Sequence, residues 1–344
     1  MQRTPCFRVC WKSLVLERHE FLVQNFDKQR PLIGIALVQW NRVEYTVDLL
    51  NALALDDRSI VRIAICDNGS EQHCWEQLKN VAGKLFPVSS TYPQTSNWRI
   101  ALFRNCNNSG FAAGINVGVQ ALLSTEVKWI WLLNNDVILK PGTLKRLKET
   151  LEHSEPGVYG TRIMNPNSSL CSGLNRFNKW TSRFQSISTD QADKALLSQD
   201  VYIDGASVVV HRSVFDSIGL LSERTFLYFE ELDFARRLAN SPFKQRTIKE
   251  VSIKHIGAGS SDRNDFRSTR MYHETWSTLD FYKTYHRWLY LVVLMLRTPL
   301  RIFMLCLRGR FSEVSSVLRA SWDYMQGVNR DKRAVDIIEK KYFK

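Results

Sequence analysis

The sequence predicts an α/β fold with a mostly parallel sheet covered by helices on both faces, followed by a C-terminal helical region. Two observations predict this class. In the first half of the chain, short β-rich apolar runs alternate with segments of helical spacing. From Thr269 onward, the patterns are helical. With 344 residues and an apolar fraction of 44%, the chain can bury a large core.

The strand–helix alternation begins at Leu32 and continues to His153. The expected strands are apolar runs that end in polar turns, at residues 32–39, 60–66, 99–104 and 128–133. The expected helices have their apolar residues near one face or are rich in small residues, at 44–55, 71–85, 110–123 and 141–153. Pro141 favours the start of the last of these helices.

Beyond Gly157 the pattern becomes mixed. Strands are expected at 158–164, 202–211 and 246–253, and helices at 212–218, 230–239 and 312–326. The chain therefore divides into an extension (1–30), a main domain (31–265, with halves 31–137 and 138–265) and a helical region (266–344).

The net charge of +13 suggests a polyanionic partner. The bases become denser after Lys283, beside the apolar run 288–296, which favours an anionic membrane surface over nucleic acid. Arg301 and Arg308 would share one helix face, and a helix with basic and apolar faces can lie in a membrane interface. Packing on the protein's own core is the alternative. No stretch reaches the roughly 18–20 apolar residues that span a bilayer, so a peripheral attachment is expected.

The seven cysteines are scattered and odd in number, which fits free thiols in a reducing compartment. The N-terminus lacks the apolar run of a secretory signal. A cytoplasmic protein is therefore expected.

Polar clusters follow the first four expected strands, at residues 39–42, 67–70, 105–111 and 134–136. In a parallel sheet these clusters lie along one edge, which is the anatomy of a nucleotide site. Asp136 ends the last cluster, and a carboxylate there can hold a hard cation that neutralises phosphates. A simple Asx turn is the local alternative. No Gly-x-Gly-x-x-Gly or Walker loop is present, so neither a dinucleotide cofactor nor ATP hydrolysis is indicated.

Three carboxylates, Glu230, Glu231 and Asp233, follow two aromatic residues. They suit the first turn of a helix, where acids are favoured by the helix dipole. Alternatively, like charges and apolar neighbours can raise the pKa of one of them towards that of a general base. His255 follows another expected strand and can complete the sphere of a metal held by Asp136.

Taken in order, these motifs resemble the family-2 inverting glycosyltransferases, most closely the bacterial rhamnosyltransferase-like branch. The motifs are Asp67-Asn68-Gly69-Ser70, the run from Asn108 to Asn116, Leu132-Leu133-Asn134-Asn135-Asp136, Gly205-Ala206, the run from Tyr228 to Asp233, and His255. The resemblance covers about residues 32–300 and implies the GT-A fold, in which a nucleotide-binding half precedes an acceptor half.

The resemblance also implies roles for individual residues. It places Asp67 on the nucleotide base and Asn41 beside the nucleoside. Other residues implied in the nucleotide-sugar site are Asn68, Asn108, Gly110, Asn116, Asn134 and Asn135.

For the chemistry, the resemblance implies that Asp136 binds Mg²⁺ or Mn²⁺ with His255 as a further ligand. Glu231 is the implied base, supported by Glu230 and Asp233. Two departures stand out. Asn134 replaces the first acid of the family's Asp-x-Asp, and Glu231 stands where Asp is commoner.

The sequence thus predicts a metal-dependent, inverting hexosyltransferase. Its donor is a nucleotide-diphospho-sugar, with dTDP-L-rhamnose as the candidate. Its acceptor is a lipid-linked or polysaccharide hydroxyl in bacterial surface-glycan synthesis. It is expected to work in the cytoplasm on the inner face of the cytoplasmic membrane, without a nucleic-acid partner.

Two alternatives remain. A sugar-phosphate nucleotidyltransferase should carry a Gly-rich loop after its first strand, and Gln39-Trp40-Asn41-Arg42 is not such a loop. A catalytically inactive membrane-bound scaffold would have no reason to retain Asp136, Glu231 and His255 together.

Overall fold

The computed structural model describes residues 32–56, 61–86, 99–164, 171–188, 191–192, 196, 200–257 and 267–328. The expected extension 1–30 and the boundary at residues 265–266 lie outside these residues.

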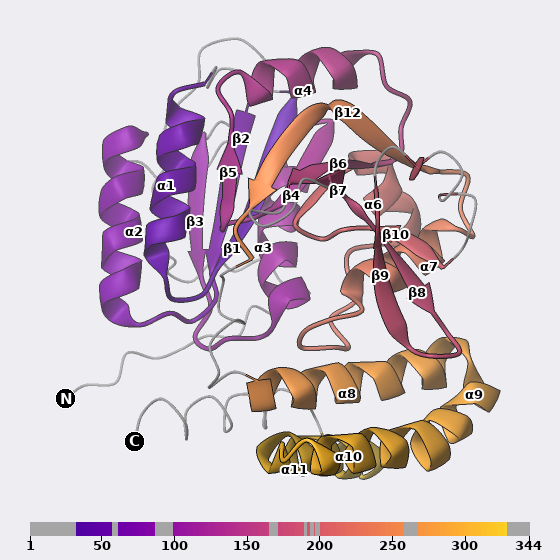
Figure 1. Ribbon diagram of the computed structural model, residues 1–344. Coiled ribbons are helices and arrows are strands. Elements are labelled where there is room, and N and C mark those ends of the chain that lie inside the picture. Colours follow the sequence, from indigo (N-terminus) through magenta and orange to yellow (C-terminus); the bar gives the residue numbers. More distant parts are fainter. Residues whose placement is uncertain are drawn as a thin grey trace.

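The described chain is built around a nine-stranded sheet with the order β3-β2-β1-β4-β11-β6-β12-β5, to which β7 is added beside β6 (Figure 1). Its first half comprises β1 (Ile33–Gln39), β2 (Val61–Asp67), β3 (Ile100–Arg104) and β4 (Trp129–Asn134). With one another these strands pair in parallel: β1 with β2, β1 with β4, and β2 with β3. Their carboxyl ends therefore meet at one edge, as the polar clusters predicted.

The second half of the sheet comprises β5 (Val137–Leu139), β6 (Val158–Met164), β7 (Cys171–Ser172), β11 (Ser207–His211) and β12 (Gln245–His255). β11 runs antiparallel to both β4 and β6, whereas β6 and β12 are parallel. The sheet is therefore more mixed than the expected, mostly parallel one. The reason is local: β11 starts beside the end of β4, with Ser207 opposite Leu133, so it can only run back along β4.

Helices cover both faces of this sheet. α1 (Val43–Ala54), α2 (Gln72–Leu85) and α4 (Thr143–Glu152) bury their apolar residues with one face. α3 (Phe111–Leu123), α6 (Arg212–Ile218) and α7 (Glu230–Leu238) do so on the other. α3 lies so close that a Cβ on Gly114 would be 2.5 Å from the Val38 side chain.

A small second sheet has the order β10-β8-β9. It is formed by β8 (Leu174–Asn178), β9 (Arg183–Ile187) and β10 (Val201–Ile203). The single strand expected at 202–211 is thus two strands, β10 and β11, divided by the loop 204–206. This loop becomes part of the candidate site described below.

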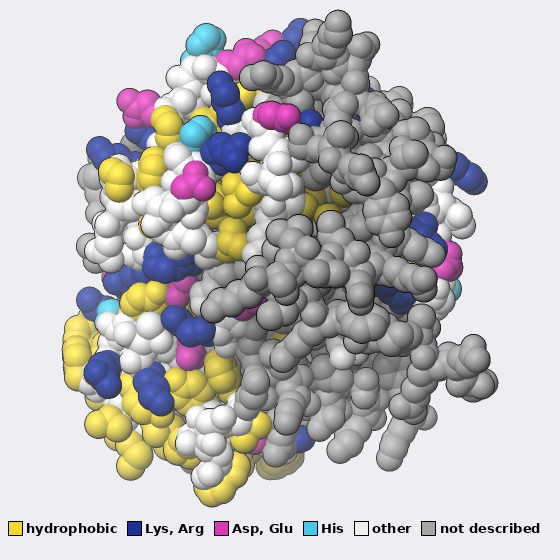
Figure 2. Space-filling model, turned by 180° about the vertical axis from the view of Figure 1, so that it is seen from behind, with side chains coloured by type: hydrophobic (Ala, Val, Ile, Leu, Met, Phe, Trp, Pro, Cys, Tyr) yellow, Lys and Arg dark blue, Asp and Glu magenta, His cyan; other side chains and the backbone are white. Residues whose placement is uncertain are grey.

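The C-terminal helices α8 (Arg267–Tyr285), α9 (Arg287–Val292), η4 (Val293–Arg297), α10 (Thr298–Leu307) and α11 (Phe311–Met325) form a separate layer (Figure 1). An aromatic core joins α8 and α9 to α7 and to the small sheet. Figure 2 shows hydrophobic side chains gathered over the region of these helices.

The segments α9, η4 and α10 form one helix of 21 residues, Arg287–Leu307. Its mean hydropathy is 1.8, so by length and composition alone it could cross a membrane. The sequence expectation that no stretch is long enough is therefore wrong. Arg297 and Arg301 interrupt the apolar run but do not lower its average enough to exclude it.

The cysteines follow the expectation only in part. Cys66, Cys74 and Cys306 are free thiols. Cys106 is disulfide-bonded, so the prediction of free thiols is wrong at that position. The scattered spacing of the cysteines offered no partner for it.

Candidate active site

A cavity of about 310 Å³ lies at the carboxyl ends of the parallel strands, where the polar clusters meet. Of the predicted site residues, those that line it are Asn68, Asn108, Gly110, Asn134, Asn135, Asp136 and His255. The fold thus brings together residues that are separated by nearly 190 positions in the sequence.

Hydrogen bonds hold one wall of the cavity in place. The Asn68 amide nitrogen donates to Asn108 Oδ1 and to the Gly110 carbonyl, both at 2.9 Å. Its oxygen accepts from Asn105 at 2.9 Å and from the Ser109 hydroxyl at 3.0 Å. Since both amide atoms bond within the protein, Asn68 mainly fixes the loop that leads into α3.

In the same wall, position 110 must be glycine. Its φ is 94°, a conformation that side chains disfavour. A Cβ there would lie 2.4 Å from the Phe226 carbonyl oxygen. The Phe111 amide donates to that same oxygen at 3.0 Å, so α3 and the loop at Phe226 close around the cavity together.

The candidate metal ligands lie side by side. β12 pairs with β5, with His255 opposite Val137, and this register sets His255 Nε2 3.1 Å from Asp136 Oδ1. Burial alone would lower the pKa of His255, but the hydrogen bond and charge of Asp136, with the charge of Asp204, raise it.

Asn134 Oδ1 is a third candidate ligand for a metal. Asn134 Oδ1 is buried, and no hydrogen bond reaches it within the described part of the chain. Its amide nitrogen lies 3.5 Å from His255 Nε2. The described residues hold no group of three His, Cys, Asp or Glu that could bind a metal. One carboxylate, one imidazole and one unpaired amide oxygen nevertheless suit a divalent cation whose remaining ligands are water or phosphate oxygens.

The missing side chain of Gly205 leaves space for the Glu231 carboxylate. A Cβ on Gly205 would lie 1.9 Å from Glu231 Oε1, so only glycine leaves room for the carboxylate. Burial, followed by the charges of Glu230 and Asp204, raises the pKa of Glu231 well above its ordinary value. A carboxyl group in this state can take a proton near neutral pH.

Asp204 was missed by the sequence reasoning. Its negative charge is a minor cause of the raised pKa of both His255 and Glu231. Its signal was its place directly before the Gly205-Ala206 motif. The uninterrupted strand expected at 202–211 hid the loop that carries it.

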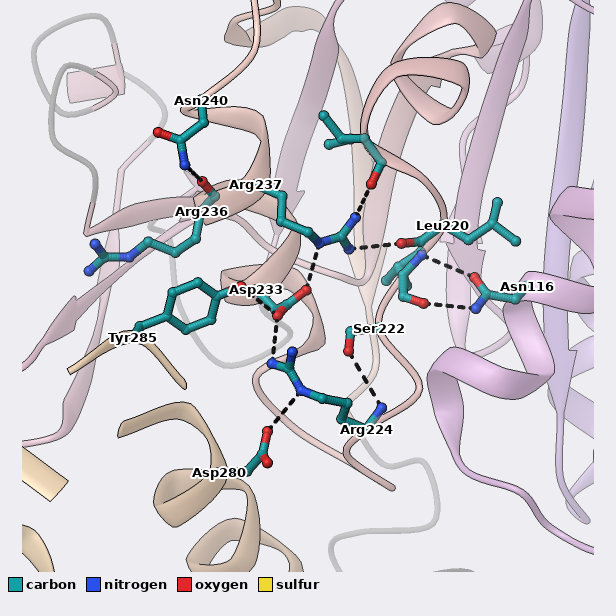
Figure 3. Close-up of polar contacts among 12 residues, drawn as sticks. Asn116, Leu220, Ser222, Arg224, Asp233, Arg236, Arg237, Asn240, Asp280 and Tyr285 are labelled. Carbon is teal, nitrogen blue, oxygen red and sulfur yellow. Dashed lines mark hydrogen bonds and ion pairs between the residues drawn. The ribbon is translucent and has the colours of Figure 1, made fainter. Parts of the chain in front are cut away.

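Asp233 is held in a network of its own (Figure 3). It accepts from Arg224 and Arg237, each at 2.9 Å, and from the Tyr285 hydroxyl at 2.7 Å. Arg224 also bonds Asp280 of α8 at 3.1 Å. Asp233 therefore fastens α7 to the preceding loop and to α8, which positions the start of α7 where Glu230 and Glu231 lie.

Asp67 and Asn41 do not line the cavity. Asp67 is fully buried, accepts from the Gln39 amide at 3.2 Å and forms an ion pair with Arg104 at 3.4 Å. Burial raises its pKa, and these partners oppose the rise. Asn41 Oδ1 accepts from the Glu71 amide at 3.0 Å, just before α2.

Asn116 also lies outside the cavity lining. Its amide donates to the Leu221 carbonyl and accepts from the Leu221 amide, at 2.9 and 3.2 Å (Figure 3). It also donates to Glu223 at 2.8 Å. Asn116 thus joins α3 to the loop that leads to Arg224.

Aromatic and basic residues complete the cavity. They are Trp40, Arg42, Tyr45, Phe226, Tyr228, Arg270 and His273. Trp40 and Arg42 belong to the expected polar cluster 39–42 and Tyr228 to the acidic motif, whereas the others were not expected there. The rings of Phe226 and His273 stack with their centroids 4.4 Å apart, and the Arg270 guanidinium lies 5.8 Å from the Tyr228 ring. Tyr45, Phe226, Arg270 and His273 come from separate segments, so no local pattern marks them. Aromatic surface and positive charge in one cavity suit a nucleotide with its phosphates.

A family model described as glycosyl transferase family 2 matches residues 35–219. The chain belongs to this family. The matched region contains Asp136 but ends before α7, and the roles of Asp136, Glu231 and His255 all stay predictions.

Individual relatives agree with the family. The chain is 22% identical over 265 residues to N-acetylglucosaminyl-diphospho-decaprenol L-rhamnosyltransferase of Mycobacterium tuberculosis, covering 71% of this chain and 82% of the relative. It is 23% identical over 194 residues to the low-salt glycan biosynthesis hexosyltransferase of Haloferax volcanii, covering 53% and 62%.

Among solved structures, the chain resembles a mannosyltransferase from Pyrobaculum calidifontis in complex with GDP-Man and Mn²⁺. The TM-score is 0.50 at 10% identity, and the match covers 90% of this chain and 92% of the other. This family-2 member therefore has the GT-A fold that the sequence motifs implied, and it is a glycosyltransferase.

Proposed function

We propose that this glycosyltransferase is an inverting hexosyltransferase that uses a nucleotide-diphospho-sugar, with dTDP-L-rhamnose as the candidate donor. The acceptor is a hydroxyl of a lipid-linked or polysaccharide glycan. The observation that carries the proposal is the aromatic and basic cavity that Asp136 and His255 line, with Glu231 in the space beside Gly205. The rhamnosyltransferase relative, named for a lipid-diphosphate acceptor, supports the choice of sugar and acceptor.

Asp136, His255 and Asn134 Oδ1 would hold a divalent cation, Mg²⁺ or Mn²⁺, at the inner edge of the cavity. When bound, the cation neutralises charge that develops on the departing diphosphate. Arg42 and Arg270, which also line the cavity, add positive charge for the same phosphates. The aromatic side chains provide the surface on which the nucleoside rests.

Glu231 is the proposed general base. Its carboxylate takes the proton of the acceptor hydroxyl as the hydroxyl oxygen attacks the anomeric carbon. The bond to the nucleoside diphosphate breaks on the opposite side, which inverts the configuration of the sugar. Glu230 and Asp204 help to keep Glu231 basic, and Asp233 positions the helix that carries it.

The proposed place of action is the cytoplasm, at the inner face of a bacterial cytoplasmic membrane. Two observations support it: the basic surplus of +13 and the exposed apolar residues of the C-terminal helices. A lipid-linked acceptor would be met at that surface.

The proposal is tested with purified protein, a panel of nucleotide sugars and a soluble acceptor analogue. We expect transfer with inversion at the anomeric carbon, read by NMR. Glu231→Gln should lower kcat about 10²–10⁴-fold while the donor still binds in a thermal-shift assay. A product with retained configuration would refute the inverting mechanism, and an active Glu231→Gln would refute the assigned base.

The same assay separates the alternatives. Formation of a nucleotide sugar from a nucleoside triphosphate and a sugar phosphate would identify a nucleotidyltransferase instead. Absence of both transfer and donor hydrolysis would favour the inactive scaffold.

A further inference from the structure

The outer face of the long helix Arg287–Leu307 is a continuous apolar stripe. Its exposed side chains recur every three or four residues and include Trp288, Leu291, Met295, Leu296, Phe303 and Leu307. Leu296 is 67% exposed and Phe303 58%. A soluble surface rarely shows apolar side chains in such a continuous row, so the stripe indicates a partner.

Two of the three arginines of this helix, Arg297 and Arg301, face the protein. Arg297 donates to the backbone carbonyls of Thr181 and Ser182, at 3.2 and 3.3 Å. Arg301 forms a 2.9 Å ion pair with Glu274 of α8. The expectation that Arg301 and Arg308 form a basic face towards lipid is therefore wrong for Arg301. These arginines fasten the helix, and the stripe is left without their charges.

Neighbouring elements extend the stripe. α11 packs beside α10 and exposes Leu318 and Trp322. Trp180, at the tip of the β8–β9 hairpin, is exposed and lies 5.5 Å from Trp288, centroid to centroid. Tryptophan is enriched at the boundary between lipid and water. Figure 2 shows hydrophobic side chains together in this part of the molecule, with Lys and Arg side chains beside them.

Charge favours a lipid surface over a second copy of the chain. The exposed Arg287 and Arg308 stand directly at the two ends of the stripe. In a molecule with a net charge of +13, two copies joined by this face would bring like charges together. An anionic bilayer would instead attract them.

The stripe is suited to lie on a bilayer rather than cross it. Crossing would pull Arg297 and Arg301 from their partners and place charged groups in hydrocarbon, which is costly. It would also separate the helix from α11, whose buried Glu313 and Asp323 belong to the protein interior. The helix can keep all of these contacts only if it stays in the plane of the membrane surface.

We propose that one membrane-binding surface rests on an anionic lipid bilayer, with both helices in the plane of the interface. It is formed by Trp180, the stripe on Arg287–Leu307 and the outer side of α11. The proposal deepens the proposed function, on which it rests only for the lipid-linked acceptor. It also gives the enzyme an orientation. The exposed Phe184 of the same hairpin packs on Phe229, 5.2 Å between centroids, directly before Glu230. The proposed catalytic carboxylates, Glu230 and Glu231, therefore lie close to the membrane-binding surface.

The test is flotation of the full-length protein with liposomes of phosphatidylcholine, with and without phosphatidylglycerol. The double variant Leu296→Glu/Phe303→Glu changes only exposed positions. Leu55→Glu is the matched control, because Leu55 is 91% exposed at the end of α1, outside the stripe. We expect the native protein to float with anionic liposomes, the double variant to partition at least about tenfold less, and the control to float like the native protein.

Depth is read by quenching with brominated lipids, comparing the native protein with Trp288→Phe. We expect the signal of Trp288 to be quenched most by bromines near the headgroups. Quenching mainly by bromines at the bilayer centre would mean a spanning helix and would overturn the proposed in-plane position. Native protein that ignores liposomes, or a double variant that floats unchanged, would also overturn it. A native dimer in light scattering that the double variant breaks would assign the stripe to a second copy.

Transfer to the soluble acceptor analogue separates this inference from the proposed function. The double variant should retain that activity and lose transfer to an acceptor embedded in liposomes. A native protein that floats but transfers no sugar would support the membrane-binding surface and refute the proposed function.

Discussion

Glu231 and Glu230 are neighbours in sequence but differ in their surroundings. Glu231 is partly buried against Gly205, whereas Glu230 is buried. Burial and the like charge of Glu230 raise the pKa of Glu231. The proposed base is therefore tuned by a residue that need not touch the substrate.

This coupling predicts a pH effect. A base acts deprotonated, so kcat/KM should rise with pH through the raised pKa of Glu231 and be lost below it. Glu230→Gln removes a like charge and lowers that pKa, so the acidic limb of the kcat/KM profile should move to lower pH. An unmoved limb would mean that Glu230 does not tune the base.

Asp136 carries the only carboxylate of the proposed cation site. Asp136→Asn would leave imidazole and amides, which compensate poorly for the water that a divalent cation loses. We expect this variant, and EDTA with the native protein, to abolish transfer, with Mn²⁺ or Mg²⁺ restoring only the native protein. Full activity in EDTA would mean that Arg42 and Arg270 neutralise the diphosphate without a metal.

At the scale of elements, the loop between β10 and β11 organises the catalytic side of the site. It carries Asp204, whose charge helps to raise the pKa of both His255 and Glu231, and it leaves space beside Gly205 for Glu231. The Ala206 carbonyl accepts from the Asn134 amide at 3.1 Å, which joins this loop to the end of β4. The loop thus links the metal side of the site to the base.

Gly205→Ala should move the Glu231 carboxylate, because the new Cβ would occupy its place. A displacement of about 1 Å can cost roughly 10²-fold in rate, so kcat/KM should fall by about that factor. The melting temperature should change little, since the displaced atoms end a flexible side chain. The matched control is Gly83→Ala in α2, where nothing lies within 4 Å of a new Cβ, and it should remain active.

At the scale of the whole molecule, α8 ties the C-terminal helices to the sheet domain. Arg224 and Tyr285 connect α7 with α8 through Asp233, and the Tyr272 hydroxyl donates to Asp323 of α11 at 2.9 Å. These contacts hold the C-terminal helices firmly against the main domain. The domain boundary at residues 265–266 stays a prediction. Removal of the chain from Trp288 onward would expose the side of α8 that packs on α11.

Tyr285→Phe removes one hydrogen bond to the buried Asp233 carboxylate. Hydrogen bonds to charged groups contribute about 1.5–3 kcal/mol, so the free energy of unfolding should fall by roughly that amount in urea titrations. Tyr290→Phe is the control, since no hydrogen bond joins the Tyr290 hydroxyl to the described residues. An equal loss in both variants would show that the Asp233 network does not fasten the two layers.

Much of the architecture could be predicted because it follows from local patterns. The run Trp129–Asn134 is a strand because its side chains are apolar on both faces, and the polar residues after it must lie at the sheet edge. The same logic located the other parallel strands and α1–α4 to within one or two residues. The ordered motifs then indicated the family, which the family model confirms.

Only the tertiary structure decided which distant groups meet. The register of β12 on β5 set His255 beside Asp136, and the packing of α8 brought Arg270 and His273 into the cavity. It also turned Arg297 and Arg301 inward, where spacing alone had suggested that Arg301 shares a basic outer face with Arg308. The physical reason is that spacing fixes which residues share a face of one element. The partner of that face depends on packing across the whole chain, which no local pattern records.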